Sequence, residues 1–356
     1  MLRPGPISSL IAACALLLPW AAISVSTNEQ EPQGQIIEKV VCANNAAQSY
    51  ALYLPSSYSP TGKWPILYAF DPGARGKIPL ERFKEAAEKY GWIVVGSNNS
   101  RNGPPQPSAD AWQALWQDTH DRFAIDQERV YTTGFSGGAR MAILFAHLCG
   151  GCVAGVIACG AGFPNGIPPS PAMRFIFFGT VGVDDFNFPE VKTLEDALMK
   201  AGIAHRVQVF PGPHDWAPVA VATEAVEWME LEAIKVGKRQ RDENLINELW
   251  QKHLAMGKAA ESANELYEAY QVFGGLIGSF KGLHDTREAE KRLHQLGQSR
   301  AVKEAMREER QQIGRQREVE RQINVLIAAS ESSNEAFEAG PSFARNHCGT
   351  AKVRES

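Results

Sequence analysis

The sequence lacks a strong excess of charge of either sign. Its 356 residues include 36 Lys and Arg against 40 Asp and Glu, so the formal net charge is only -4. Such a balance supplies no extended basic surface, and we therefore expect neither a nucleic acid nor an anionic membrane surface as a partner. The length allows one large domain or two smaller ones.

Cysteine is also scarce. The six cysteines are one CxxC pair and four isolated residues: Cys149 with Cys152, then Cys14, Cys42, Cys159 and Cys348. These residues have no spacing typical of a four-ligand zinc site, and we expect no metal and no cofactor. A redox CxxC follows a strand and opens a helix, whereas this one follows a predicted helix. The pattern therefore favours a structural disulfide near the CxxC over redox catalysis.

Long apolar runs are confined to the N-terminus. Arg3 precedes an apolar stretch over residues 7–25, in which Pro19 is followed by small residues. This pattern predicts an export signal cleaved after Ser24, and hence a periplasmic or secreted protein. Two alternatives stay open. The stretch is about long enough to remain as a membrane anchor, and Cys14 resembles the attachment site of a lipoprotein.

Short apolar runs alternate with segments of helical spacing from residue 36 to about residue 236. The expected strands are Ile36–Cys42, Ser49–Leu54, Trp64–Phe70, Trp92–Gly96, Arg129–Thr133, Val153–Cys159, Arg174–Gly179 and Arg206–Phe210. The expected helices are Leu80–Tyr90, Ala109–Arg122, Gly137–Leu148, Glu190–Lys200 and Val219–Ile234. This alternation predicts an α/β fold with a mostly parallel sheet covered by helices on both faces. The first two strands are expected to form an antiparallel edge.

Strand signals stop after about residue 238, and proline becomes rare. Residues 243–279 have helical spacing and resemble a tetratricopeptide hairpin, which must pack on something to bury its apolar face. Two more helices are expected, and the second, Ala301–Ile327, is so charged that we expect it to be solvated or bound to a partner. The predicted organisation is a signal peptide (1–24), an α/β domain (25–238), a helical region (239–330) and a flexible tail (331–356).

A G-x-S-x-G motif follows one of the predicted strands. It runs from Gly134 to Gly138 with Ser136 at its centre, and a helix rich in Ala and Met begins directly after it. A strand, a sharp turn with small neighbours, and then a helix is the arrangement that lifts a nucleophilic serine above the edge of a sheet. The alternative is a plain strand-to-helix turn in which Ser136 caps the helix.

His214 is the expected base for this serine. It follows the last predicted strand in the loop Pro211-Gly-Pro-His-Asp-Trp, whereas the other seven histidines lie in helical patterns, at a strand start or in the tail. A carboxylate should orient the imidazole and stabilise its charged form. Asp185 and Asp184 both follow the preceding strand, between the serine and the histidine, and the spacing favours Asp185 over Asp184.

An anionic tetrahedral intermediate needs two N–H donors. Gly137, directly after the serine, is expected to supply one. The loop after Trp64–Phe70 should supply the other, and because Pro72 has no N–H, Gly73 or Ala74 is expected there.

At these motifs the segment from Ile36 to about Val236 resembles the α/β-hydrolase superfamily, and within it secreted esterases related to polyhydroxybutyrate depolymerases and feruloyl esterases. The carrying segments are Ile125–Tyr131, Gly134–Gly138 with Met141, Asp185–Asn187 and Gly212–His214. The resemblance implies hydrolysis of acyl esters through Ser136, His214 and Asp185. In two places the sequence departs from these relatives. Asp71-Pro72 replaces the usual His-Gly of the oxyanion loop, and Ala139 stands where they often have Gly.

The substrate pocket is read only coarsely from the sequence. The link at about Gly160–Met173 is short, so an open cleft without a large lid is expected, suited to bulky or polymeric esters. Its candidate lining residues are Arg101, Phe163, Phe186 and Trp216.

The leading hypothesis is therefore a serine esterase that forms an acyl-enzyme. A peptidase of the same fold, and a binding or scaffold protein that uses the helical region, are the alternatives. The helical region is expected to supply no catalytic group and to contact a protein partner or a second copy. A chain ending near Lys238 is accordingly expected to fold and stay active.

Overall fold

A computed structural model describes residues 31–319, 321, 322 and 325. The predicted signal peptide (1–24) and tail (331–356) lie outside these residues. The elements in chain order are β1 (Ile36–Cys42), β2 (Asn45–Tyr53), β3 (Trp64–Phe70), α1 (Lys77–Tyr90), β4 (Ile93–Ser97), α2 (Pro105–Arg122), β5 (Ile125–Phe135), α3 (Gly137–Leu148), β6 (Gly155–Cys159), β7 (Ile176–Gly182), α4 (Phe188–Lys200), β8 (His205–Phe210), α5 (Val219–Lys235), α6 (Glu243–Ser262), α7 (Leu266–Phe280) and α8 (Arg287–Gln298). None of the helices within the described residues is long and apolar enough to cross a membrane.

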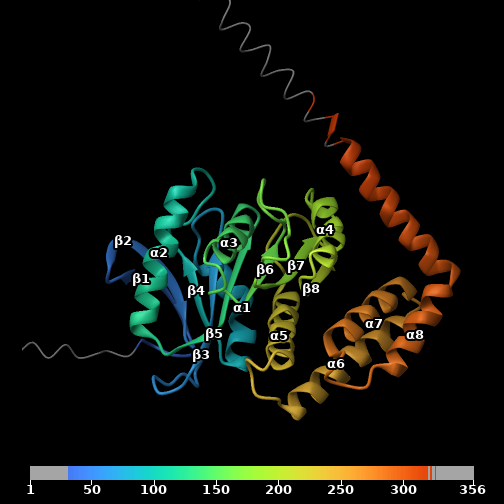
Figure 1. The fold of residues 1–356 in the computed structure, drawn as a ribbon, viewed down its shortest axis with the longest axis horizontal. Helices are drawn as coiled ribbons and strands as arrows, with labels where there is room; N and C mark the ends of the chain where they lie inside the picture. Colours follow the sequence, from blue (N-terminus) through green and yellow to red (C-terminus); the bar gives the residue numbers. More distant parts are fainter. Residues whose placement is uncertain (1–30, 320, 323–324, 326–356) are drawn as a thin grey trace, which may run out of the picture. The chain divides into compact units, whose positions relative to one another are not determined.

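The eight strands form one sheet in the order β1-β2-β4-β3-β5-β6-β7-β8 (Figure 1). β2 runs antiparallel to both β1 and β4, and every pairing from β4 through β3 to β8 is parallel. Helices cover both faces. This arrangement confirms the predicted α/β-hydrolase fold, including the antiparallel edge.

Alternating side chains of the buried strands supply two separate cores. In β3, Ile66 and Tyr68 enter a cluster with α2 and α3 on one face, while Leu67 enters a cluster with α1 and α5 on the other. Because successive side chains of a strand point to opposite faces, a strand buried on both sides must be apolar throughout. The parallel arrangement brings the carboxyl ends of β5, β7 and β8 to the same edge of the sheet.

Many element boundaries differ from the sequence prediction by one to three residues, and β2, β5 and α2 each begin four residues earlier than predicted. β5 begins at Ile125 rather than Arg129, because Ile125 pairs with Trp64 at the start of β3 although the intervening residues are polar. α2 begins at Pro105 rather than Ala109. Proline fits the first turn of a helix, where the missing N–H has no intrahelical acceptor in any case.

The helical region packs against α5 and shares a core with it. Leu231 and Ile234 of α5 belong to the same buried cluster as Leu249 of α6, Phe273 of α7 and Leu296 of α8. The predicted boundary near residue 238 stays a prediction. The structure adds that the apolar surface of α5 is divided between the sheet and the helices that follow it.

Acidic residues of α5 are buried where it meets the helical region, and they form ion pairs with arginine and lysine side chains. Glu230 is inaccessible and accepts hydrogen bonds from Arg129 of β5 and from Arg239, which follows α5. Glu227 accepts from Tyr90 at 2.9 Å and from Lys252 of α6 at 2.7 Å. A buried carboxylate is tolerated only when charges and donors compensate it. These contacts therefore fix how the helical region meets α5.

The long charged helix after α8 also has intramolecular partners. Residues 300–319 are helical, and Ile313 packs against the cluster of β7, β8 and α4. Glu309 accepts a hydrogen bond from Tyr267 at 2.9 Å, and Arg317 donates to Thr193 of α4 at 2.7 Å. The prediction of a helix that is solvated or bound to a separate partner is thus incomplete: part of its surface binds this same chain.

Candidate active site

Ser136 lies in the sharp turn between β5 and α3. Its backbone has φ 53° and ψ -120°, a conformation that residues with a side chain rarely adopt. The flanking glycines make the turn possible. A Cβ on Gly134 would come within 2.2 Å of the carbonyl oxygen of Gly138, and one on Gly138 within 2.0 Å of that of Phe70. The G-x-S-x-G spacing is therefore a steric requirement of this turn.

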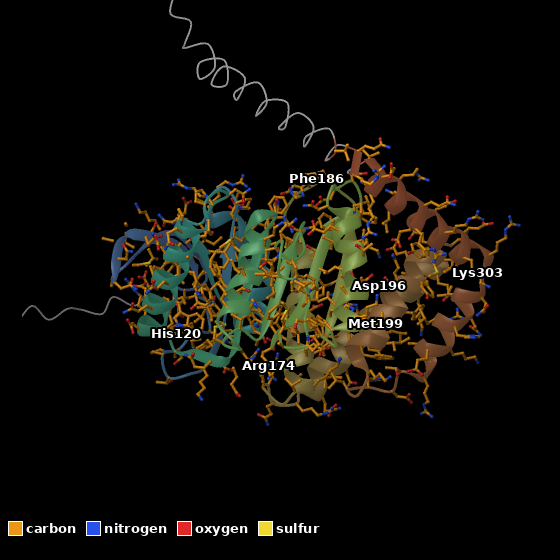
Figure 2. The ribbon with its side chains drawn as sticks, turned by 45° about the horizontal axis from the view of Figure 1, so that its top comes forward. His120, Arg174, Phe186, Asp196, Met199 and Lys303 are labelled. Carbon is orange, nitrogen blue, oxygen red and sulfur yellow. A yellow bond between two sulfur atoms is a disulfide. The ribbon has the colours of Figure 1, made fainter. Side chains whose placement is uncertain are left out.

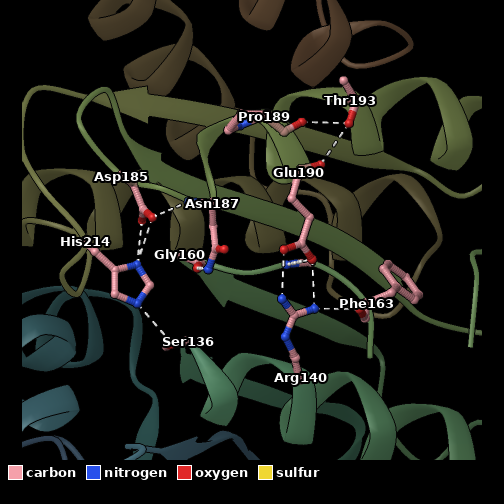
Figure 3. A network of polar contacts seen from close by, with 11 residues as sticks. Ser136, Arg140, Gly160, Phe163, Asp185, Asn187, Pro189, Glu190, Thr193 and His214 are labelled. Carbon is pink, nitrogen blue, oxygen red and sulfur yellow. Dashed lines mark hydrogen bonds and ion pairs between the residues drawn. The ribbon is translucent and has the colours of Figure 1, made fainter. Parts of the chain in front are cut away.

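His214 joins Ser136 to Asp185 (Figure 3). Its Nε2 lies 3.0 Å from Ser136 Oγ, and its Nδ1 lies 2.8 Å and 2.9 Å from the two carboxylate oxygens of Asp185. A carboxylate only accepts hydrogen bonds, so we assign the ring proton to Nδ1, which leaves Nε2 to accept the serine proton. Asp185 is fully buried, and the exposed Asp184 makes no such contact. The structure thus brings together Asp185, His214 and Ser136, and leaves Asp184 outside.

Two aromatic rings hold the imidazole from either side. The ring centroids of Phe135 and Phe186 lie 4.5 Å and 4.2 Å from that of His214. Phe135 is buried beside the serine, whereas Phe186 directly follows Asp185 and is 61% exposed at the rim (Figure 2). Phe186 therefore packs against the imidazole while much of its surface faces solvent, and its predicted place in the pocket stays a prediction.

The loop after β3 contradicts the predicted second oxyanion donor. The N–H of Gly73 donates to Asp71 Oδ1 at 2.8 Å, and the N–H of Ala74 donates to the carbonyl of Asp71 at 3.1 Å. Both donors are thus used within the loop. The prediction was wrong because the acidic residue in place of the usual His-Gly folds the loop around its own carboxylate. The N–H of Gly137 has no intrahelical acceptor at the first position of α3, so it is available, and its role in binding an oxyanion stays a prediction.

Asp71 connects this loop to the loop of His214. Its buried carboxylate also accepts from Arg75 Nε at 2.8 Å and from Trp216 Nε1 at 2.9 Å. Burial by itself would raise the pKa of Asp71, but the hydrogen bonds from Arg75, Trp216 and Gly73 outweigh burial and lower it. Asp71 is therefore an ionised anchor between the two loops.

Of the other predicted pocket residues, Trp216 is only 2% exposed because its indole faces Asp71. It supports the site from behind and does not line it. Phe163 is buried against Phe177 of β7. Arg101 is exposed, and its backbone forms an isolated bridge with Gly73.

Sequence reasoning missed one ion pair beside the serine. Arg140 forms a bidentate pair with Glu190 of α4 at 2.8 Å and 2.7 Å, and it also donates to the carbonyl of Phe163 (Figure 3). Glu190 in turn accepts from the N–H of Gly162 at 3.1 Å. The pair fixes the link between β6 and β7 as one wall of the site. Its sequence signal was the position of Arg140 four residues after Ser136, which is one helical turn.

A cavity of about 1070 Å³ lies away from these residues, at the far edge of the sheet between β8 and α7. Among its lining residues are Arg206, Val207, Tyr270 and Gly275. None of the residues around Ser136 described above reaches it, so cavity size does not mark the reactive site in this molecule.

No protein-family model and no curated protein matches this chain. Solved structures with a similar fold include S-formylglutathione hydrolase from Staphylococcus aureus, at 15% identity and a TM-score of 0.44, over 56% of this chain and 98% of that one. A feruloyl esterase module from Clostridium thermocellum complexed with sinapinate is 16% identical at a TM-score of 0.44, over 54% and 85%. Esterase 2 from Thermogutta terrifontis is 13% identical at a TM-score of 0.43, over 59% and 99%. At these values the likeness concerns the fold only, and the function must be argued from the site.

Proposed function

We propose that this chain is a serine hydrolase that cleaves carboxylic esters through an acyl-enzyme. One observation carries the proposal: the hydrogen-bonded series from Asp185 through His214 to Ser136, with Ser136 Oγ 3.0 Å from His214 Nε2. A serine hydroxyl is a weak nucleophile, and an adjacent base held in the correct tautomer is what activates it.

The reaction follows from this geometry. Ser136 Oγ forms a bond to the ester carbonyl carbon while its proton moves to His214 Nε2, and the carbonyl oxygen becomes negative beside the N–H of Gly137. The bond to the alcohol oxygen then breaks, and the alcohol leaves with the proton from His214. Water repeats the sequence on the acyl-enzyme, with His214 as base, and releases the acid and free Ser136. Asp185 stabilises the imidazolium that forms twice in each cycle.

The shape of the site supports substrates that do not need to be enclosed. The link between β6 and β7 has 16 residues and contains no helix, and the ion pair between Arg140 and Glu190 holds it against α3 and α4. Phe186 stands exposed at the rim. We therefore propose bulky or polymeric esters as the substrate class, consistent with a wall that is fixed rather than hinged.

Covalent labelling tests the reaction. We expect a fluorophosphonate to label Ser136 and the wild-type chain to hydrolyse p-nitrophenyl acetate, while Ser136→Ala loses both without a lower melting temperature. Ser262→Ala, at the exposed end of α6, is the matched control and should behave as wild type. A folded wild-type chain that neither takes the label nor cleaves the ester would refute the proposal. Faster turnover of peptides than of esters would favour a peptidase instead.

We also propose that the protein works in an oxidising compartment. The structure contains a disulfide between Cys149 and Cys152, just after α3, with a Cα–Cα distance of 5.6 Å. Disulfides persist mainly in exported proteins, which agrees with the N-terminal pattern. Expression with and without residues 1–24, followed by cell fractionation, tests this. Recovery of the full chain in the cytoplasm with free thiols at both positions would contradict it.

A further inference from the structure

The reaction proposed above needs a second hydrogen-bond donor beside the N–H of Gly137. The loop after β3 does not provide it, because Pro72 has no N–H and the N–H groups of Gly73 and Ala74 are held by Asp71. Two donors aimed at the developing oxyanion are usual for acyl transfer, and side-chain amides can serve as well as the backbone. The donor must therefore come from another element near Gly137.

Asn102, in the loop between β4 and α2, is placed where such a donor is needed. A Cβ on Gly137 would lie 1.9 Å from Asn102 Oδ1 and 3.3 Å from its Nδ2. The carboxamide thus occupies the space that a side chain at position 137 would fill. The carboxamide of Asn102 lies against Gly137, which follows the nucleophile and begins α3.

The backbone of Asn102 is held firmly while its amide is free. Its N–H donates to the carbonyl of Pro72 at 2.9 Å, and the preceding residue, Arg101, forms a bridge with Gly73. The side chain of Asn102 is exposed, and no described residue hydrogen-bonds to its amide. The same contacts that tie up the β3 loop therefore fix the position of Asn102 over Gly137.

We propose that Asn102 is a catalytic residue whose Nδ2–H, together with the N–H of Gly137, binds the oxyanion. This inference rests on the proposed function. Rotation of the amide about its last bond exchanges Oδ1 and Nδ2, which are nearly the same size, so either can face the substrate oxygen. A neutral donor on a fixed backbone stabilises the negative oxygen of the tetrahedral intermediate more than the neutral ester carbonyl. Because the interaction is stronger with the intermediate than with the bound ester, loss of the Asn102 amide should lower kcat and leave KM nearly unchanged.

Isosteric replacement of the amide tests the assignment. Asn102→Asp keeps the shape but replaces the donor by an acceptor of negative charge, and Asn102→Ala removes the group. With p-nitrophenyl acetate we expect kcat to fall roughly 100-fold or more in both variants, and further in Asn102→Asp, with KM changed by less than about threefold. Melting temperatures should match wild type, since the side chain is exposed and unpaired. Asn45→Asp at the exposed start of β2, whose Oδ1 accepts from the N–H of Ala47, is the matched control and should keep full activity.

The outcomes separate this inference from the proposed function. If wild type is active, Ser136→Ala is inactive, and both Asn102 variants keep kcat within about threefold of wild type, the function stands and the role of Asn102 is overturned. A change confined to KM assigns Asn102 to substrate binding and also overturns it. If wild type cleaves no ester and takes no fluorophosphonate, the proposed function itself has failed.

Discussion

Mild acid should loosen the junction between α5 and the helical region through one histidine. His253 of α6 is 3% exposed and lies near Arg206 of β8 and Lys252 of its own helix. Burial, then Arg206 and then Lys252, lowers its pKa from 6.5 to about 3. Glu227 of α5, 3.9 Å from Nε2, would favour the charged form, but Lys252 already pairs with that carboxylate. We therefore treat His253 as neutral in the folded chain.

The sign and size of the effect follow from proton linkage. The unfolded chain takes up a proton at His253 near pH 6.5, and the folded chain does so only near pH 3, so stability is full above pH 6.5 and falls as the pH drops through this window. At pH 4.5 the loss of unfolding free energy from this single group is about 3 kcal/mol, and near pH 3 it is about 4 kcal/mol, at 1.36 kcal/mol per pH unit. At pH 4.5 the size of this loss depends mainly on the ordinary pKa of a histidine in the unfolded chain.

Urea unfolding at pH 8 and at pH 4.5 measures this loss by difference. His253→Gln removes the titrating group, so the variant should lose about 3 kcal/mol less than wild type between the two pH values, while all other groups cancel. His294→Gln, at an exposed position on α8, is the control and should follow wild type. His253→Phe repeats the test with an apolar side chain. Equal losses in wild type and in both His253 variants would show that this histidine is protonated or solvated in the folded chain.

Three further outcomes are expected. Asp71→Asn should lower the free energy of unfolding by about 2 kcal/mol at neutral pH and should reduce kcat. Because the pKa of Asp71 is lowered in the folded chain, the difference in stability between variant and wild type should shrink in thermal unfolding as the pH falls below 4. A difference that does not change with pH would contradict an ionised Asp71. The double replacement Cys149→Ser and Cys152→Ser should lower the free energy of unfolding by at most about 2 kcal/mol, since the disulfide closes a short loop. Ester hydrolysis should be unchanged. A double variant that is folded but inactive would show that the disulfide has a role in the reaction. A chain ending at residue 238 should aggregate or unfold, contrary to the sequence expectation. Without the later helices Leu231 and Ile234 are exposed to solvent, and Glu230 loses its contact with Arg239. A truncated chain that is monomeric by light scattering and active in the ester assay would disprove this.

The sequence predicted the parts of the site whose signals are local. Ser136 is identified by glycines whose Cβ atoms have no room, and His214 and Asp185 by their positions after the last two strands. A local pattern suffices for these because a parallel sheet brings the ends of successive strands to one edge. The preference for Asp185 over Asp184 agrees with the contact that the structure shows.

The parts that the sequence could not predict depend on contacts between distant segments. Gly73 and Ala74 were expected as donors because they follow Pro72, which has no N–H, in the loop after β3, and only the fold shows that Asp71 takes both N–H groups. Asn102 carries no sequence signal, since it reaches Gly137 only through the pairing of two loops. Similarly, the glutamates of α5 suggest a solvated face in the sequence. They are buried because arginines of β5, β8 and the segment after α5 approach them.

The position of α5 has a consequence for how the chain folds as it is made. The buried cluster on its second side extends to Val302, so roughly 65 residues must still emerge after α5 before that side is fully buried, a delay of several seconds at usual rates of synthesis. Throughout that interval the nascent α/β part exposes Leu231, Ile234 and the carboxylate of Glu227, which still lacks Lys252. Partly folded chains that expose apolar surface are prone to aggregation, which is the general reason that chaperones exist. The C-terminal helices therefore set the moment at which folding can be completed.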